Sequence, residues 1–187
     1  MRLEQVKVYE FSELSEEIRE NVIENWRNDE TFFWGDEWVE SLETFSDWFG
    51  ITIKNYSAGE YGRNHVNFSF EYDEGSYFYD FKNSYVRSDT QGIRLFKMLF
   101  NQYSIDSLLN NDCYLTGYIA DEKLLEPIRE FIKKPKTNKT FYELIDDCFW
   151  SWLNGFQADY DYWLSEEAII EDIESNEYSF LVNGEIY

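Results

Sequence analysis

The stretch from residue 5 to residue 26, QVKVYEFSELSEEIRENVIENW, contains the signals of both a strand and a helix. Side chains alternate in character over residues 5–11, which is the period of a strand. Ser15 is then a suitable N-cap, and the acidic residues that follow it suit the first turn of a helix. The next apolar residues recur every four positions and predict one buried stripe, made of Leu14, Ile18, Val22 and Trp26. We therefore expect an α+β fold that opens with a strand and an amphipathic helix.

A second amphipathic helix is predicted for residues 36–49. Its buried stripe consists of Trp38, Leu42, Phe45 and Phe49. Gly50 is well placed to end the helix, because glycine adopts the left-handed conformation of a helix C-terminus at little cost.

Residues 51–87 are predicted to form an antiparallel meander. Apolar residues alternate with polar ones over 66–72, and the Asp73-Glu74-Gly75 turn leads to a further strand at 77–81. Asn183-Gly184 predicts a type I′ hairpin between 178–182 and 185–187. This hairpin can pair with the meander or with the first strand, and the sequence leaves both pairings open.

Four further helices are predicted. One covers residues 90–100, and another ends near Lys133, with Pro127 as the first residue of its regular part. Thr140 and Glu143 form a capping box that opens the third, and Ser165 caps the last. No linker divides the chain. We expect a single acidic α+β domain over residues 1–187, with an antiparallel sheet (meander plus C-terminal hairpin) packed with about five to six helices.

The charge is large and unevenly distributed. The net charge is −22. Residues 1–50 contribute −10, and residues 141–187, a segment without Lys or Arg, contribute −12. So many like charges repel one another and destabilise the folded chain. They serve either to keep the protein soluble or to bind a basic partner. Direct nucleic-acid binding is disfavoured because it requires clustered Lys and Arg, and an anionic membrane would repel the chain. We expect a basic protein surface as the partner.

Catalytic chemistry has little support in the sequence. His65 is the single histidine, and no catalytic or nucleotide-binding motif is present. Cys113 and Cys148 are predicted to be buried free thiols, and we expect neither a cofactor nor a metal. A metal-dependent hydrolase that uses Asp159 and Asp161 is the least favoured alternative. No apolar run is long enough to span a bilayer and no signal peptide is recognised, so we expect a cytoplasmic protein.

The candidate partner-binding residues are acids on the solvent faces of the predicted helices, together with one tryptophan. Carboxylates at helical spacing lie about 5–6 Å apart, so they can occupy a groove shaped for phosphates. The full set is Glu13, Glu17, Glu20, Glu24, Asp29, Glu30, Trp34, Asp36, Glu37, Glu40, Glu43, Asp47, Asp159, Asp161, Glu166, Glu167, Glu171 and Asp172.

Several segments resemble one known group of proteins: VYEFSELSEE at 8–17, LLEPIREF at 124–131, LSEEAII at 164–170 and IESNEYSF at 173–180, followed by Asn183-Gly184. They resemble a family of small acidic phage and prophage proteins of unknown function, some of which are labelled toxin–antitoxin stability antitoxin. The shared motifs are caps and turns, so no catalytic residue is carried over. The resemblance implies a phage accessory gene expressed in a bacterial host cell. In that setting small acidic proteins often inhibit host defence nucleases.

Two functional hypotheses follow. The first is a phage-encoded counter-defence inhibitor that binds the basic nucleic-acid-binding surface of a host defence nuclease, either a CRISPR effector or a restriction enzyme. Mimicry of DNA and allosteric inhibition both remain open as its mode of action. The second is an antitoxin-like or scaffolding module that binds through aromatic patches, with the charge serving solubility. The oligomeric state, monomer or homodimer, is open as well.

Overall fold

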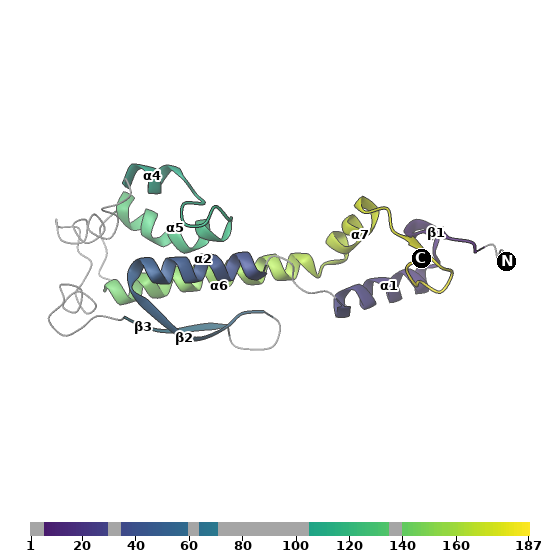
Figure 1. Cartoon of the computed structure of the whole chain (residues 1–187), viewed down its shortest axis with the longest axis horizontal. Helices are drawn as coiled ribbons and strands as arrows, with labels where there is room; N and C mark the ends of the chain where they lie inside the picture. The colour runs from purple at the N-terminus through teal and green to yellow at the C-terminus, as the bar shows by residue number, and fades with distance from the viewer. Residues whose placement is uncertain (1–5, 30–34, 60–63, 71–104, 135–139) are drawn as a thin grey trace, which may run out of the picture. The chain divides into compact units, whose positions relative to one another are not determined.

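The computed structural model describes residues 6–29, 35–59, 64–70, 105–134 and 140–187 (Figure 1). Contacts divide the chain into two compact units. The terminal unit consists of Met1–Phe33 and Asp159–Tyr187, and the central unit is Trp34–Ala158. The expectation of a single domain stays a prediction.

In the terminal unit, the two ends of the chain form a small antiparallel sheet. Strand β1 (Tyr9–Glu10) pairs with β4 (Ser179–Phe180), so that Tyr9 lies opposite Phe180. Ile186 adds a bridge on the other side of Phe180. The C-terminal hairpin therefore pairs with the first strand, which is one of the two pairings that the sequence left open.

Two helices cover this sheet and share a core with it. Helix α1 spans Glu16–Asp29, and α7 spans Glu166–Ser175. Ser15 precedes α1 and its carbonyl accepts from Arg19 N at 2.9 Å, while the Ser165 hydroxyl caps α7 by accepting from Ala168 N at 3.2 Å. The buried side chains of the core come from both chain ends: Phe11, Leu14, Val22, Ile23, Ile169, Ile173 and Phe180.

Two local predictions in this unit are wrong. The strand predicted over residues 5–11 is reduced to Tyr9–Glu10, because Phe11–Glu13 forms the 3-10 helix η1, whose capping box joins Glu10 N to Glu13 Oε2 at 3.0 Å. The turn at Asn183-Gly184 is not type I′, since Gly184 has a φ of +86° whereas Asn183 does not have a positive φ. Hydrogen bonds from Gly184 N to Leu181 O and from Leu181 N to Glu185 O instead define a three-residue loop.

The central unit is built around a pair of long helices, with a β-hairpin on one side and shorter helices on the other (Figure 1). Helices α2 (Gly35–Phe49) and α6 (Phe141–Trp163) lie together, with the β2–β3 hairpin on one side and α4 (Ile105–Asn110) and α5 (Ala120–Lys133) on the other (Figure 1). The indole of Trp152 is fully buried between them and donates to Trp38 O at 2.9 Å. Helix α6 continues beyond the central unit, since residues from Asp159 onward belong to the terminal unit.

The central hairpin is antiparallel, as the alternation of its residues predicts. Strand β2 (Ile51–Ser57) pairs with β3 (His65–Phe70), with Ile51 opposite Phe70 and an irregularity between Ile53 and Asn55. The predicted third strand at 77–81 and the predicted helix at 90–100 lie outside the described residues.

The α+β class is confirmed, because the described residues form helices together with two antiparallel two-stranded sheets.

Predicted helix ends in the central unit are confirmed where the signal is local. Gly50 follows α2 with a φ of +58°, and Thr140 and Glu143 exchange the hydrogen bonds of a capping box at 2.6 and 3.2 Å. The prediction for Pro127 is wrong, because α5 begins at Ala120 and Pro127 lies inside it. Leu124, Leu125 and Ile128 around the proline are buried, and this burial stabilises a helix that Pro127 weakens locally.

Two buried charged residues hold the segment between α4 and α5. Oδ2 of Asp121 accepts from the backbone N–H groups of Leu115, Thr116 and Gly117 at 2.8, 2.8 and 3.1 Å, and Oδ1 accepts from the Thr116 hydroxyl at 2.9 Å. Arg129 donates from Nε to Leu108 O at 2.9 Å and pairs with Asp112 at 3.4 Å. Because each buried charge is surrounded by partners, this segment is ordered without regular secondary structure.

Candidate protein-binding surface

The fold concentrates negative charge in the terminal unit. The 62 residues of this unit include 18 acids and 4 Lys or Arg, a net charge of −14, whereas the 125 residues of the central unit have a net charge of −8. Antiparallel pairing of β1 with β4 places acids from the two ends of the sequence in one small unit. The acidic segment of residues 1–50 is divided between the two units, because the acids of α2 belong to the central unit.

Helix α1 presents its acids to solvent, as its periodicity predicts. Glu17, Glu20 and Glu24 are exposed, and so is Glu16, which was not among the predicted residues. Glu24 pairs with Arg27 at 3.5 Å, and Arg27 Nε also donates to Leu164 O at 2.9 Å. One of the few cations of this unit thus helps to hold α1 against the connection between α6 and α7.

Glu13 has a local structural role. It is exposed, and its carboxylate accepts the Glu10 N–H within η1. One of its carboxylate oxygens is therefore already occupied by the cap of η1 and is less available to a partner.

The acids at the C-terminal end of the chain are also mostly exposed. Glu166, Glu167 and Glu171 on α7 lie at the surface, as do Asp159 and Asp161 in the last turns of α6. The Tyr162 hydroxyl donates to Glu171 at 3.4 Å, and this carboxylate, with a smaller contribution from desolvation, raises the pKa of Tyr162 above its usual range.

Asp172 differs from the other acids of α7. It is half-buried and accepts from the side-chain amide of Asn176 at 2.9 Å. Its carboxylate therefore takes part in the C-terminal end of α7 and is less available to a partner than Glu171.

The acids of α2 form a separate set in the central unit. Asp36, Glu40, Glu43 and Asp47 are exposed, and Glu37 is half-buried. The predicted site residues Glu30 and Trp34 lie outside the described residues, as does the side chain of Asp29. Of the predicted set, the structure therefore brings together the acids of η1, α1, α7 and the end of α6 in one unit.

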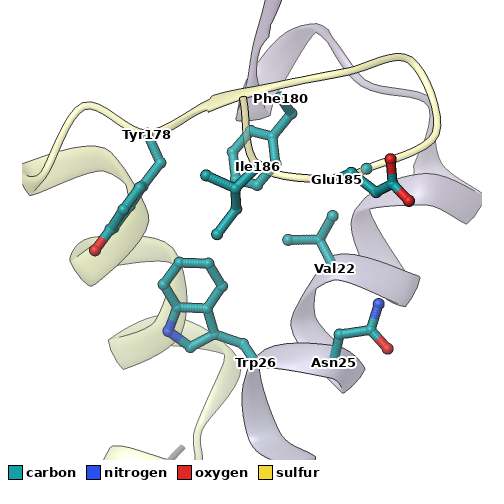
Figure 2. Close-up of a pocket in the computed structure, with 8 residues that line it drawn as sticks. Val22, Asn25, Trp26, Tyr178, Phe180, Glu185 and Ile186 are labelled. Atoms are coloured by element: carbon teal, nitrogen blue, oxygen red, sulfur yellow. The ribbon is translucent and has the colours of Figure 1, made fainter. Parts of the chain in front are cut away.

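Sequence reasoning missed an aromatic pocket in the terminal unit. The pocket has a volume of about 450 Å³ and is lined from α1 by Val22, Asn25 and Trp26 and from the C-terminal segment by Tyr178, Phe180, Gly184, Glu185 and Ile186 (Figure 2). The rings of Trp26 and Tyr178 meet edge to face, with centroids 5.2 Å apart at 71°. Trp26 belongs to the apolar stripe of α1 and was expected to be buried, but it is half-buried at the pocket wall.

The single histidine lies on a strand of the central hairpin, where it contacts an asparagine of the neighbouring strand. His65 Nε2 lies 3.0 Å from Asn55 Oδ1 across the β2–β3 hairpin. Within the described ranges, no group of three or more His, Cys, Asp and Glu is arranged to hold a metal ion. The helices seen in those ranges are all too short or too polar to cross a bilayer.

Cys113 and Cys148 are not joined in a disulfide, and they differ in exposure. Cys148 is buried, as predicted, whereas Cys113 is only half-buried, so the prediction for it is wrong. Desolvation raises the pKa of the Cys113 thiol, and the carboxylates of Asp121, Asp112 and Glu122 raise it further. The pKa shift is opposite to the one that activates a cysteine nucleophile.

Comparison with known proteins found no matching family model, no similar curated protein and no similar solved structure. The resemblance to small acidic phage proteins accordingly stays a prediction.

Proposed function

We propose that this protein binds a basic protein surface through its terminal unit and thereby blocks access of nucleic acid to that surface. The observation that carries the proposal is the net charge of −14 on 62 residues. Because both chain ends contribute to this unit, it contains 18 acids, of which residues 1–33 and residues 159–187 each supply nine.

The exposed carboxylates of α1 and α7 suit such a partner physically. Carboxylates one helical turn apart lie about 5–6 Å from each other, well inside the Debye length of about 8 Å at physiological salt, so they repel one another in the free protein. A groove lined with Lys and Arg would relieve this repulsion and would speed encounter by electrostatic steering. A nucleic-acid-binding surface is a groove of that kind, because it neutralises phosphates with Lys and Arg.

We further propose that the partner is a nuclease of a bacterial defence system, a CRISPR effector or a restriction enzyme, and that this protein is its phage-encoded inhibitor. The support for this narrower statement is the resemblance of residues 8–17 and 164–180 to phage proteins. Occupation of the nucleic-acid site by mimicry is the mode that the clustered carboxylates favour.

A second candidate function rests on the aromatic pocket. In an antitoxin-like or scaffolding protein, Trp26 and Tyr178 would supply the contact energy and the acids would only maintain solubility. The two candidates predict opposite responses to salt and to charge removal, which allows one experiment to separate them.

The experiment compares two variants with the same loss of charge. Glu16→Gln/Glu17→Gln/Glu20→Gln removes three exposed carboxylates from α1, and Glu40→Gln/Glu43→Gln/Asp47→Asn removes three exposed carboxylates from α2. Each protein is immobilised and used to capture partners from bacterial lysate at low and at high salt, with mass spectrometry of the eluates. The captured protein is then purified and tested for displacement of labelled DNA.

We expect a nucleic-acid-binding protein that is released by salt, is lost from the α1 variant, is retained by the α2 variant and cannot bind DNA and this protein together. Capture that is insensitive to salt and equal for the two variants would contradict the proposal and would favour the aromatic module. Equal loss from both variants would show that total charge, and not the terminal unit, determines binding.

A further inference from the structure

We infer that the pocket between α1 and the C-terminal hairpin holds one cationic side chain, Lys or Arg, of the partner protein. The inference rests on the proposed function, in which the partner surface is basic. It adds a defined site and a defined chemical group to a binding surface that is otherwise specified only by charge.

The walls of the pocket combine apolar and π surfaces that are accessible to solvent. Val22, Phe180 and Ile186 supply aliphatic and aromatic contacts, and the edge-to-face arrangement of Trp26 and Tyr178 leaves ring surface directed into the pocket (Figure 2). Tyr178 is 36% exposed and Ile186 is 54% exposed. The pocket volume of about 450 Å³ falls within the range of about 300–1,000 Å³ that is usual for ligand sites.

The polar groups of the pocket favour a positive charge. Glu185 and Asn25 line one side of it (Figure 2), and neither of the two ion pairs seen among the described residues involves Glu185. No Lys or Arg lies among the described residues of the lining. Since the whole unit has a net charge of −14, an anionic ligand would be repelled.

A neutral apolar ligand fits less well than a cationic one. Glu185 is an exposed residue of the lining, with its carboxylate at the edge of the pocket (Figure 2), so it attracts a cation but contributes nothing to the binding of a neutral ligand. The stem of Lys or Arg can instead pack on Val22 and Ile186, while its charged group reaches the carboxylate and the electron-rich face of a ring. One pocket thus satisfies both parts of an amphipathic cation, as an anchor within an acidic surface.

The test uses peptide probes and needs no partner. The probes are Ac-Gly-Arg-Gly-NH₂ and the same peptide with citrulline, which keeps the shape of arginine but has no charge. Each is titrated into the full-length ¹⁵N-labelled chain, and the indole N–H signal of Trp26 is followed, after its assignment from the spectrum of Trp26→Phe. We expect saturable shifts with arginine and an affinity for citrulline lower by about fivefold to tenfold, the product of a cation–π contact and a charge-assisted hydrogen bond at a partly exposed site.

Two variants with the same loss of charge test whether Glu185 is the carboxylate that distinguishes arginine from citrulline. Glu185→Gln should reduce the affinity for the arginine peptide to that for the citrulline peptide. Glu174→Gln removes the same charge from an exposed position of α7 outside this pocket and should leave the ratio of the two affinities unchanged. Equal affinities for the two peptides in the unmodified chain, or no saturable shift with arginine, would overturn the inference.

Failure of this inference is distinguishable from failure of the proposed function. If the arginine peptide does not bind the pocket, but partner capture is still lost at high salt and in the α1 variant, the acidic surface binds the partner without this anchor. If the arginine peptide binds, but capture does not depend on the acids of α1, the inference about the pocket is supported and the proposed function is contradicted.

Discussion

Replacement of Gly184 by alanine tests whether the C-terminal hairpin is held against α1, and therefore whether the aromatic pocket exists in solution. Gly184 has a φ of +86°, a conformation that side chains other than glycine disfavour. A Cβ atom at this position would lie 2.9 Å from Val22 Cγ2 and 3.0 Å from Ile18 Cγ2. The substitution therefore introduces both backbone strain and a steric clash.

The magnitude follows from three contributions. The left-handed conformation costs an alanine about 1–2 kcal/mol, and an extra methyl group in a filled site costs about 1–3 kcal/mol. The restricted unfolded chain of the variant offsets about 0.4–1 kcal/mol of this cost. These contributions together span about 1–4.6 kcal/mol, and we expect Gly184→Ala to lower the free energy of unfolding by about 2–3 kcal/mol, the middle of that range.

The assay is urea unfolding followed by circular dichroism and by tryptophan fluorescence. Gly117→Ala is the control for strain alone, because Gly117 has a φ of +96° and its Cβ would meet nothing within 4 Å. Its cost should be about 1 kcal/mol, the strain less the gain in the unfolded state. In a double-mutant cycle, Val22→Ala should relieve part of the clash, so the double variant should be more stable than the sum of the single effects predicts.

Two outcomes would refute this reasoning. The first is a Gly184→Ala variant that is no less stable than the native chain when Gly117→Ala shows its expected cost. The second is strict additivity of Gly184→Ala and Val22→Ala. Either result would mean that the hairpin does not contact α1 closely, and the pocket would lose one of its two walls.

Two further predictions concern the central unit. Asp121→Ala should lower the free energy of unfolding by about 3–5 kcal/mol in the same urea assay, because it leaves three backbone N–H groups without their acceptor. Glu122→Ala is the control, and an equal effect of the two substitutions would contradict the structural role of Asp121. Cys113 should react with iodoacetamide at pH 8 more slowly than a free thiol, because its raised pKa keeps the thiol protonated at a pH where a free thiol is partly ionised, and the difference should vanish in urea. Mass spectrometry of Cys148→Ser isolates the reaction at Cys113, and a native rate equal to the denatured rate would disprove the shift.

The sequence by itself determined those features of this protein that depend on neighbouring residues. The capping box of Thr140 and Glu143, the cap at Ser165 and the helix end at Gly50 each involve groups within about four residues of one another, so the local pattern is sufficient. The apolar stripes of α1 and α2 were predictable for the same reason, since helical periodicity selects one face. The large negative charge was a matter of composition alone.

Local signals failed where a distant contact or a competing hydrogen bond decided the outcome. Phe11 continues the alternation of a strand, but the Glu10–Glu13 capping box and the burial of Phe11 in the core favour a 3-10 turn. Pro127 suits the first position of a helix, but the buried residues around it extend α5 in both directions. In each case the free energy of core burial exceeds a local preference of about 1–3 kcal/mol.

The candidate site was decided by tertiary structure. The sequence identified the acids and most of their exposed positions, but the pairing of Tyr9 with Phe180 is what brings α1 and α7 into one unit. Helix α2 belongs to the other unit. The pocket requires Trp26 from one end of the chain and Tyr178 and Glu185 from the other. No periodicity spans that separation, because side chains so far apart in sequence meet only when a shared core brings their backbones together.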